Sequence, residues 1–262
     1  AYTTINKSTD YFNTKLYTGN GSTQSITGVG FQPDFTWIKN RSIAEHHILT
    51  DSARGAPLNI YSNLANAENN TAEFLKSFDS DGFTVGTSVE VNGSSNNMVS
   101  WNWKAGTTSG LSGGNITPSA YSYNATSGFG IYKYTGNGYA DQTIPHGLGK
   151  KPQIIFYKNL SSGTNWVAQT NLLGNRVQLV LNGTDASNTD SRLGASDNWD
   201  TTNFNVGSYG DMNNSGSSYV AYVFCNIDGY SKIGTYTGNG SSDGTFVYTG
   251  FKPAWIMVKR TG

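Results

Sequence analysis

Few residues of this chain combine the type and the spacing that catalysis or metal binding needs. Two of its three histidines, His46 and His47, are adjacent. Neighbouring residues of a strand point to opposite faces of a sheet, so these two rings are poorly placed to bind one metal ion. His47 follows Lys39 by eight residues, and in a second copy of the same sequence pattern Trp166 follows Lys158 by eight residues. A position that holds tryptophan in one copy is more typical of packing than of catalysis.

Asp79 and Asp81 are the best metal-ligand candidates, in the sequence Asp79-Ser-Asp-Gly82. This segment resembles part of a calcium loop, but the third acidic position and the distant glutamate are missing. Aspartate and asparagine before glycine are also the usual residues of a hairpin turn, and we favour that interpretation. The sequence therefore predicts no metal site and no cofactor, with Asp79 and Asp81 as incomplete candidates.

No carboxylates are placed as a catalytic pair. A glycosidase needs two carboxyl groups about 5–10 Å apart, and no acidic residue keeps its place in both copies of the repeated pattern. The sequence has no Gly-x-Ser-x-Gly nucleophile elbow either, and Arg54-Gly55-Ala56 is more typical of a turn than of an adhesion motif. We predict that the protein is not an enzyme, with a polysaccharide depolymerase as the remotest alternative.

The elements that must position any functional group are repeated along the chain. The pentapeptide Tyr-Thr-Gly-Asn-Gly occurs at Tyr17–Gly21, Tyr134–Gly138 and Tyr236–Gly240. A proline follows each tyrosine after 16, 18 and 17 residues, and each proline starts a hydrophobic run that ends in lysine. These runs are Pro33–Lys39, Pro152–Lys158 and Pro253–Lys259. Three matches of this length indicate a modular array.

The repeat has a second half that occurs only twice. Phe83-Thr-Val-Gly86 is followed by Val99-Ser-Trp101, and Phe204-Asn-Val-Gly207 by Val220-Ala-Tyr222; the first phenylalanine and the last aromatic are 18 residues apart in both. The third copy reaches Gly262 without this half. We therefore expect the chain to be part of a longer polypeptide, unless the last segment completes a sheet of the second module.

The pattern of each copy predicts an all-β fold. Glycine, asparagine and serine punctuate aromatic and β-branched runs every 8–12 residues or so. In the runs after the prolines, alternate residues fall on one face of a strand. We predict tandem antiparallel β-sandwich modules of jelly-roll or concanavalin-like type.

Three segments carry more specific expectations. The aromatic pairs Trp101 with Trp103 and Tyr222 with Phe224 recur at the same place, which favours core residues over a sugar-stacking platform. Residues 63–74 form either a short helix or an extended loop. Val177–Leu181 is expected to be a strand with Asn182-Gly183 as the turn after it.

The domain boundaries follow from the repeats. We assign residues 1–105 to the first sandwich with its N-terminal lead-in, and residues 128–227 to the second. Residues 106–127 read as a flexible or loosely docked Gly/Ser-rich linker. Residues 228–262 begin a third, incomplete module, and the short junction before it predicts that modules two and three are coupled more rigidly than modules one and two.

Charge and hydropathy exclude two classes of partner. The chain has 17 basic and 17 acidic residues and a formal net charge of zero. Nucleic-acid binding uses clustered lysine and arginine, so we predict no nucleic-acid partner. No stretch approaches the roughly 18 apolar residues of a membrane span, so we expect a soluble chain. Cys225 is the single cysteine, expected to be a buried, inert thiol.

Several of these segments together resemble a repeat protein of tailed, notably marine, bacteriophages. They include Gly30-Phe-Gln-Pro-Asp-Phe-Thr-Trp-Ile-Lys-Asn-Arg41, Trp101-Asn-Trp-Lys-Ala-Gly106, Ile144-Pro-His-Gly-Leu-Gly149 and the three Tyr-Thr-Gly-Asn-Gly segments. The resemblance implies a virion structural or tail-fibre-like protein with no catalytic residues to carry over, which assembles as a homo-oligomer. It also implies that the third module normally runs to completion and that Ala1 follows a removed methionine.

On this basis we expect a non-catalytic scaffold and adhesion module on the virion exterior, of the tail-fibre, spike or capsid-projection type. Its partners would be other virion proteins, copies of itself and, in a further reading, a host surface glycan. A glycan-binding host-recognition module is the alternative, and it predicts aromatic side chains exposed at loop tips. The best candidates are Tyr139, Trp199 and Tyr209, for which packing within a turn is the competing interpretation.

Overall fold

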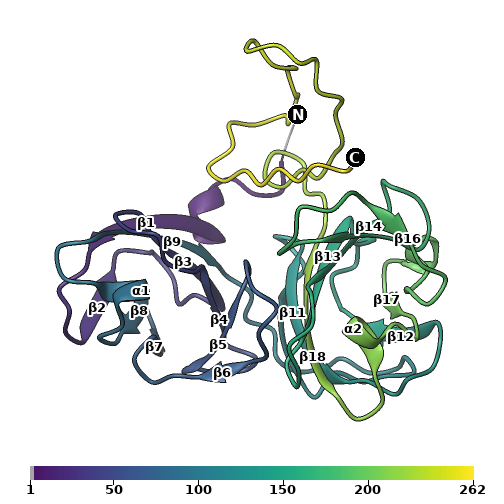
Figure 1. Cartoon of the computed structure of the whole chain (residues 1–262), viewed down its shortest axis with the longest axis horizontal. Coiled ribbons are helices and arrows are strands. Elements are labelled where there is room, and N and C mark those ends of the chain that lie inside the picture. The colour runs from purple at the N-terminus through teal and green to yellow at the C-terminus, as the bar shows by residue number, and fades with distance from the viewer. Residues whose placement is uncertain (1–2) are drawn as a thin grey trace.

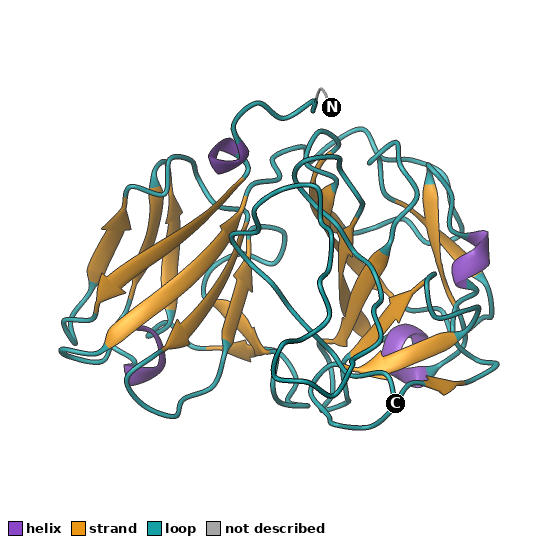
Figure 2. Cartoon of the chain, turned by 90° about the horizontal axis from the view of Figure 1, so that it is seen from above, coloured by secondary structure: helices purple, strands orange, loops and turns teal. Residues whose placement is uncertain are grey.

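Antiparallel strands make up nearly all of the regular structure, as the sequence predicts. The computed structural model describes residues 3–262, so the expectation for Ala1 lies outside the described residues. Two β-sandwiches lie side by side, and residues 228–262 cross the top of their junction (Figure 1). Seen from above, this last segment has no strands and passes over the gap between the two sets of strands (Figure 2).

Module 1, residues 12–105, contains one large and one small sheet. The large sheet has the order β1 (Phe12–Thr18), β9 (Asn97–Trp103), β3 (Phe35–Asn40), β4 (Ile48–Asp51), β5 (Leu58–Tyr61), β6 (Asn69–Asn70). The small sheet has the order β2 (Gln24–Thr27), β8 (Gly82–Val85), β7 (Leu75–Asp79). The short helices are η1 (Ser8–Asp10), just before β1, and α1 (Val89–Asn92), between β8 and β9.

Module 2, residues 106–227, repeats this arrangement, with one more strand in its large sheet and one fewer in its small sheet. Its large sheet has the order β10 (Ala120–Asn124), β11 (Phe129–Thr135), β18 (Ser218–Phe224), β13 (Ile154–Asn159), β14 (Val167–Thr170), β15 (Val177–Val180), β16 (Asn188–Thr189). The small sheet pairs β12 (Gln142–Pro145) with β17 (Asn203–Val206). The short helices are η2 (Ser196–Asn198) and α2 (Gly210–Asn213).

The two modules are structural repeats in register as well as in topology. Trp37 of β3 lies opposite Trp101 of β9, and Phe156 of β13 lies opposite Tyr222 of β18. These are the positions that the repeated sequence pattern aligns. The chain has therefore formed the same sandwich twice, with β1, β3 and β9 in the places of β11, β13 and β18.

The expectation of a flexible or loosely docked linker between the modules was wrong. Residues 120–124 of the expected linker form β10, which pairs with β11 along its whole length. The residues before it are also docked, since Gly106 N donates to Ser122 Oγ and Ile116, 6 % exposed, joins the core of module 2. The linker is therefore built into the second sandwich, because its apolar residues find a sheet edge and a core to cover.

Residues 63–74 form no helix. They make an irregular loop that contains the two-residue strand β6, and only the loop alternative for this segment is correct. Phe74 at its end is 4 % exposed within the core of module 1. Long-range packing of this kind overrides a weak local helix propensity. The expected strand at Val177–Leu181 is confirmed as β15, followed by a turn.

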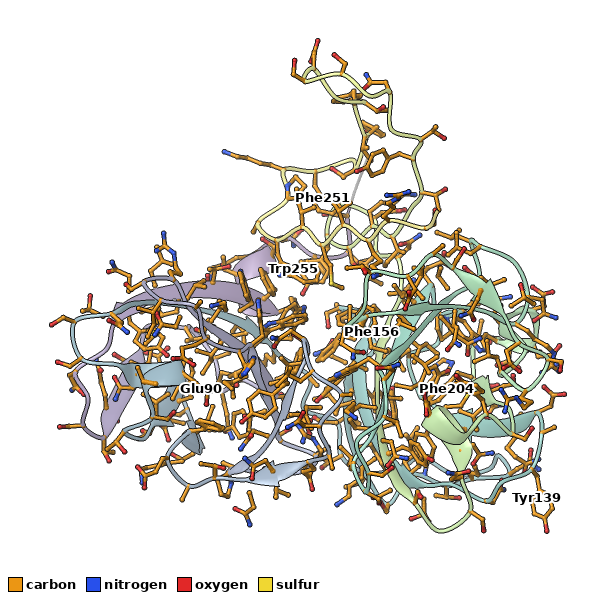
Figure 3. The ribbon with its side chains drawn as sticks, in the orientation of Figure 1. Glu90, Tyr139, Phe156, Phe204, Phe251 and Trp255 are labelled. Carbon is orange, nitrogen blue, oxygen red and sulfur yellow. The ribbon has the colours of Figure 1, made fainter. Side chains whose placement is uncertain are left out.

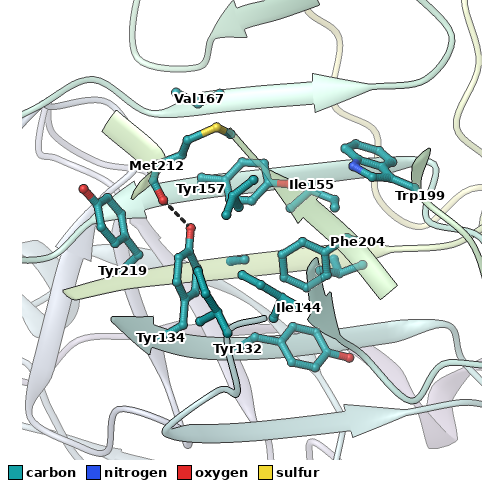
Figure 4. Packing of buried hydrophobic residues seen from close by; sticks show 14 of the residues in the cluster. Tyr132, Tyr134, Ile144, Ile155, Tyr157, Val167, Trp199, Phe204, Met212 and Tyr219 are labelled. Carbon is teal, nitrogen blue, oxygen red and sulfur yellow. Dashed lines mark hydrogen bonds between the residues drawn. The ribbon is translucent and has the colours of Figure 1, made fainter. Parts of the chain in front are cut away.

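The Tyr-Thr-Gly-Asn-Gly motif joins β1 of module 1 and β11 of module 2 to the short helix before the last strand of each module. Tyr134 Oη donates a hydrogen bond of 2.7 Å to the Met212 carbonyl oxygen, and Tyr17 Oη donates one of 2.6 Å to that of Val91 (Figure 4). A Cβ on Gly136 would lie 2.3 Å from the Asn214 carbonyl oxygen. The motif therefore needs a hydroxyl at its first position and a glycine at its third.

A buried asparagine, the last residue of each of these short helices, completes this joint. Asn213 Oδ1 accepts from Asn137 N at 2.9 Å, while its Nδ2 donates to the carbonyl oxygens of Tyr139 and Gly207, both at 2.8 Å. Asn92 makes the same set of contacts in module 1, to Asn20, Ser22 and Gly86. The side chains of both asparagines are fully buried. The repeated motif therefore serves to stabilise the fold.

The third pentapeptide has no such joint. Tyr236 is 51 % exposed, and its hydroxyl makes no hydrogen bond within residues 3–262. We expect Tyr17→Phe and Tyr134→Phe each to lower the free energy of unfolding by about 1 kcal/mol, since each leaves a carbonyl without its donor. Tyr236→Phe should change it by less than about 0.5 kcal/mol. Urea unfolding of the three variants measures this, and three equal effects would contradict it.

Each module encloses its own core between its large and small sheets. In module 2 this core holds Tyr132, Tyr134, Tyr157, Trp199 and Phe204 (Figure 4). In module 1 it holds Ile26, Ile38, Phe83 and Val91 among others. Burial raises the pKa values of Tyr134 and Tyr157 well above the usual value of a tyrosine, so these phenols stay neutral.

Cys225 lies at the end of β18 and is fully buried, as expected. Burial raises the pKa of its thiol to about 12. The thiolate is the reactive form, so we expect a thiol reagent at pH 8 to label the native chain at least 100-fold more slowly than the chain in 8 M urea. Rapid native labelling would show that this end of the sheet opens.

Candidate functional site

The large sheets of the two modules face each other and enclose a third core, which we call the shared core. Phe35 of β3 stacks on Tyr222 of β18 with ring centroids 4.5 Å apart, and it also contacts Phe129 of β11 at 6.0 Å. Trp166, before β14, stacks on the other side of Tyr222 at 6.2 Å. The side chains between the sheets thus form one continuous aromatic layer, and the predicted core role of Trp103 and Tyr222 is confirmed.

This layer corrects the expectation for the junction between modules one and two. Each large sheet is covered on both faces, by its own small sheet on one side and by the other module on the other. Phe35 and Trp37 point to the shared core, whereas Ile38 points to the core of module 1. The two modules are therefore joined by a continuous buried core, and they are not loosely coupled.

A buried ionic network crosses the same junction. Arg54 Nε donates to Asp51 Oδ2 at 2.5 Å, and its Nη1 donates to Glu68 Oε1 at 3.0 Å. Tyr222 of module 2 donates its hydroxyl hydrogen to Asp51 Oδ2 at 2.6 Å and accepts from Arg54 Nη2 at 3.2 Å. The side chains of Arg54 and Asp51 have no exposed surface. Such a network is stable only while every member keeps its partners.

The charge state of this network is fixed by its neighbours. Burial by itself would lower the pKa of Arg54, but Asp51, Tyr222 and Glu68 outweigh it and raise the pKa above its ordinary value. Burial raises the pKa of the Tyr222 phenol well above its usual value, against the opposing effect of Arg54. The guanidinium therefore stays charged and the phenol stays protonated, which keeps both hydrogen bonds across the junction.

Loops of module 1, the end of β13 and the residues that follow β13 complete the contact. Lys158 Nζ donates to the carbonyl oxygens of Ala65 and Thr164, at 3.1 and 2.8 Å. Trp166 Nε1 donates to the Tyr61 carbonyl oxygen at 2.8 Å, and Glu68 N donates to that of Leu160 at 3.1 Å. Module 2 thus contacts β5 and the loop after it in module 1 through two side-chain donors and one main-chain acceptor.

Lys158 makes the stability of this junction depend on pH. Burial lowers the pKa of its amine to about 8, and Asp211 partly opposes this. Because an unfolded lysine titrates near 10.4, the unfolded chain binds more protons between these two values. Stability should therefore rise by about 1–2 kcal/mol from pH 7.5 to 9.5, and Lys158→Met should remove the rise. If the free energy of unfolding of Lys158→Met, measured by urea titration, rose with pH as much as that of the parent, this would be contradicted.

The C-terminal segment packs on the same shared core. Trp255 lies at the junction of the modules (Figure 3), 5.4 Å from Trp103 and 6.1 Å from Trp37 between ring centroids. Met257 also contacts the cluster. Lys259 Nζ donates to the Gly183 carbonyl oxygen, and Ser187 N donates to that of Thr261 at 2.9 Å. All three copies of the repeat therefore contribute to one core.

A groove of about 570 Å³ opens between module 1, the turn after β15 and residues 254–259. Trp37 Nε1 on its wall donates to His47 Nδ1 at 2.8 Å. Burial, with smaller effects from Lys39 and His46, lowers the pKa of His47 to about 4. The ring is neutral near pH 7, as an acceptor must be. The described residues that line the groove include no carboxylate, so they do not form the pair that glycoside hydrolysis needs.

The two aspartates that the sequence singled out hold turns. Asp81 accepts from Gly28 N at 3.0 Å and from Gly30 N at 2.6 Å, and these bonds lower its pKa. Asp79 accepts from the hydroxyls of Ser77 and Thr84, both at 2.7 Å. Within residues 3–262, no three histidine, cysteine or acidic side chains lie close enough together to hold a metal ion.

The aromatic residues expected at loop tips do not form a platform. Trp199 is 2 % exposed within the core of module 2, and Tyr209 packs against that core with Arg192 over its ring at 4.9 Å. Only Tyr139 is exposed, by 69 %, and it lies at the outer edge of module 2, far from the junction (Figure 3). For Trp199 the competing interpretation of packing is therefore correct, because the segment after η2 folds into the core of module 2.

The sequence did not reveal the network of Arg54, Asp51 and Glu68. The segment at Arg54 is the turn that we expected, but its side chain faces a residue of the other module. Asp51 and Arg54 are aligned with Thr170 and Leu173 of module 2, so the repeat gives no signal for this network. A charged pair in an otherwise weakly charged repeat was the one available hint.

Comparison with known proteins identifies the family but no activity. A family model described as a domain of unknown function, DUF7483, matches residues 7–262. The chain belongs to this family. Searches of curated proteins and of solved structures found no match. Among the described residues of this DUF7483 member, no helix has the length and the apolar character to cross a membrane.

Proposed function

We propose that this chain is a non-catalytic scaffold and adhesion protein on the exterior of a bacteriophage particle, of the tail-fibre, spike or capsid-projection type. One observation carries the scaffold role: the repeated residues are used for folding and for packing the repeats on one another. In module 2, hydrogen bonds of Tyr134 and Asn213 join the pentapeptide loop to helix α2. Phe35 and Tyr222 stack between the two modules. The particle location rests on the sequence resemblance.

The junction between modules 1 and 2 supports a mechanical role for the chain. Tandem modules on a flexible linker bend at the linker, whereas a shared core transmits force between them. Here aromatic rings, hydrogen bonds of Tyr222 to a buried ion pair and a main-chain hydrogen bond all cross the junction. A rod, spike or projection needs this stiffness. The longer edge strands β1 and β10 would pack against other virion proteins or further copies of the chain.

The location can be tested on particles of a phage whose genome encodes the chain. Gold-labelled antibodies raised against residues 106–227 should bind at a fixed external position on intact particles in electron micrographs. Particles carrying an unrelated exterior protein serve as the control. Absence of the chain from purified particles, or labelling only after the particles are disrupted, would overturn the proposal.

A further inference from the structure

The third repeat copy is packed on one face only. From Phe251 to Arg260 the residues alternate between partly buried and exposed, which is the pattern of a strand with one covered face, although no strand pairs with them. Trp255 and Met257 are on the covered face. They are aligned with Phe35 and Trp37 of module 1 and with Ile154 and Phe156 of module 2, and all six side chains belong to or contact the shared core.

The opposite face is apolar and open. Ile256 is 71 % exposed and Val258 is 63 % exposed, whereas the aligned Ile155 and Tyr157 of module 2 are fully buried in its own core. Phe246, which aligns with the buried Ile26 of β2, is 85 % exposed. The third copy thus presents to solvent the residues that each complete module covers with its small sheet.

The joints between successive copies are the same. Glu68 N of module 1 donates to the Leu160 carbonyl oxygen of module 2, and Ser187 N of module 2 donates to that of Thr261 in the third copy. These residues are aligned in the repeat. The repeated lysines also contact the preceding copy. Lys158 Nζ donates to the Ala65 carbonyl oxygen of module 1, and Lys259 Nζ donates to the Gly183 carbonyl oxygen of module 2.

The third joint of this series is open. Lys39, the aligned lysine of module 1, donates to the adjacent Asn40 carbonyl oxygen and reaches no other copy. Trp37 and His47 beside it line the groove that faces the third copy. A head-to-tail contact that repeats between successive units around one core closes into a ring when the rotation permits. Here the groove is the place where the last joint would form.

We infer that residues 236–259 are half of a third sandwich, and that their open face is the docking surface for a β segment with the second-half pattern of the repeat. That pattern is Phe-x-Val-Gly followed by a strand with alternating aromatic residues, as in residues 83–103 and 204–224. Its last strand would pair with residues 254–259 as β9 pairs with β3. When the segment also carries the residues that precede this pattern, as residues 160–203 do in module 2, the loop after its equivalent of β15 would fill the groove and meet Lys39.

The first test supplies such a segment to the whole chain. Residues 160–227 of the chain are appended after Gly262, and hydrogen exchange is measured on peptides covering residues 244–259. We expect exchange at least 10-fold slower than in the parent chain. The matched control carries the same appended residues in scrambled order and should show no protection. A folded extension that leaves these amides unprotected would overturn the inference.

The second test uses the parent chain, so it decides even if the extension does not fold. Trp255→Ser should release the docked segment and speed proteolysis after residue 250 at least 10-fold, whereas Ile256→Ser should leave the rate unchanged. Equal effects of the two substitutions would overturn the inference, because the open face would then already be packed. Sedimentation of the parent at increasing concentration checks a second copy as the occupant: a dimer that Ile256→Ser dissociates would also overturn it.

Discussion

Arg54→Met should lower the free energy of unfolding by about 3–5 kcal/mol, the largest effect that we expect from a single substitution. Methionine fills much of the same volume but leaves the Asp51 carboxylate buried without its cation. It also removes the donor to Tyr222, so the hydrogen bonds across the junction are incomplete. Both modules should lose stability together, because the network joins their shared core. Urea unfolding followed by tryptophan fluorescence measures the change.

Arg41→Met is the matched control, since Arg41 is exposed and makes no side-chain ion pair within the described chain. It should change the free energy of unfolding by less than about 0.5 kcal/mol. An effect of Arg54→Met within 1 kcal/mol of this control would show that the ionic network contributes little. Two separate unfolding transitions in wild-type protein would show that the shared core does not couple the modules.

Asn213→Ala and Asn92→Ala should each cost about 3 kcal/mol, because each removes a fully buried amide that satisfies several main-chain groups. Without Asn213, Asn137 N loses its acceptor, and the carbonyl oxygens of Tyr139 and Gly207 lose their donor. The pentapeptide would then detach from the helix α2. The similar environments of the two asparagines predict similar losses, measured by the midpoint and slope of urea unfolding.

Asn198→Ala tests the same change at an exposed position of η2 where the side chain makes no hydrogen bond within the described chain. It should be neutral within about 0.5 kcal/mol. If Asn92→Ala were as mild as this control while Asn213→Ala were costly, the two copies of the motif would not be equivalent in energy. The repeat would then be preserved in geometry only.

Much of the fold could be predicted from local patterns. The strands after Pro33 and Pro152 follow from residues that alternate along the chain, and the tight turns follow from glycine and asparagine that accept positive φ. Gly21 and Gly138 have φ of +72° and +78°. These properties belong to a few neighbouring residues, so one sequence is enough to detect them. The linker error at residues 120–124 and the undecided segment at residues 63–74 both fall where distant contacts decide the conformation.

The candidate site was less accessible to sequence reasoning. Trp199 stands in a loop between η2 and β17, but its ring belongs to the buried core of module 2. Arg54 looks like a surface arginine in a glycine turn, but a tyrosine 168 positions later makes it a buried ion-pair member. Contacts over such separations leave no periodic signal in the chain.

Local sequence patterns establish that this protein is an all-β array of one repeated unit, because strand alternation and turn residues are local and recur in each copy. How the copies are arranged depends on contacts in three dimensions. In modules 1 and 2 the face of the large sheet that turns away from the small sheet is apolar, and the pattern does not say whether these faces meet each other, a partner or solvent. That choice depends on the summed packing of rings such as Phe35 and Tyr222, which are far apart in sequence and meet only after both sandwiches have formed.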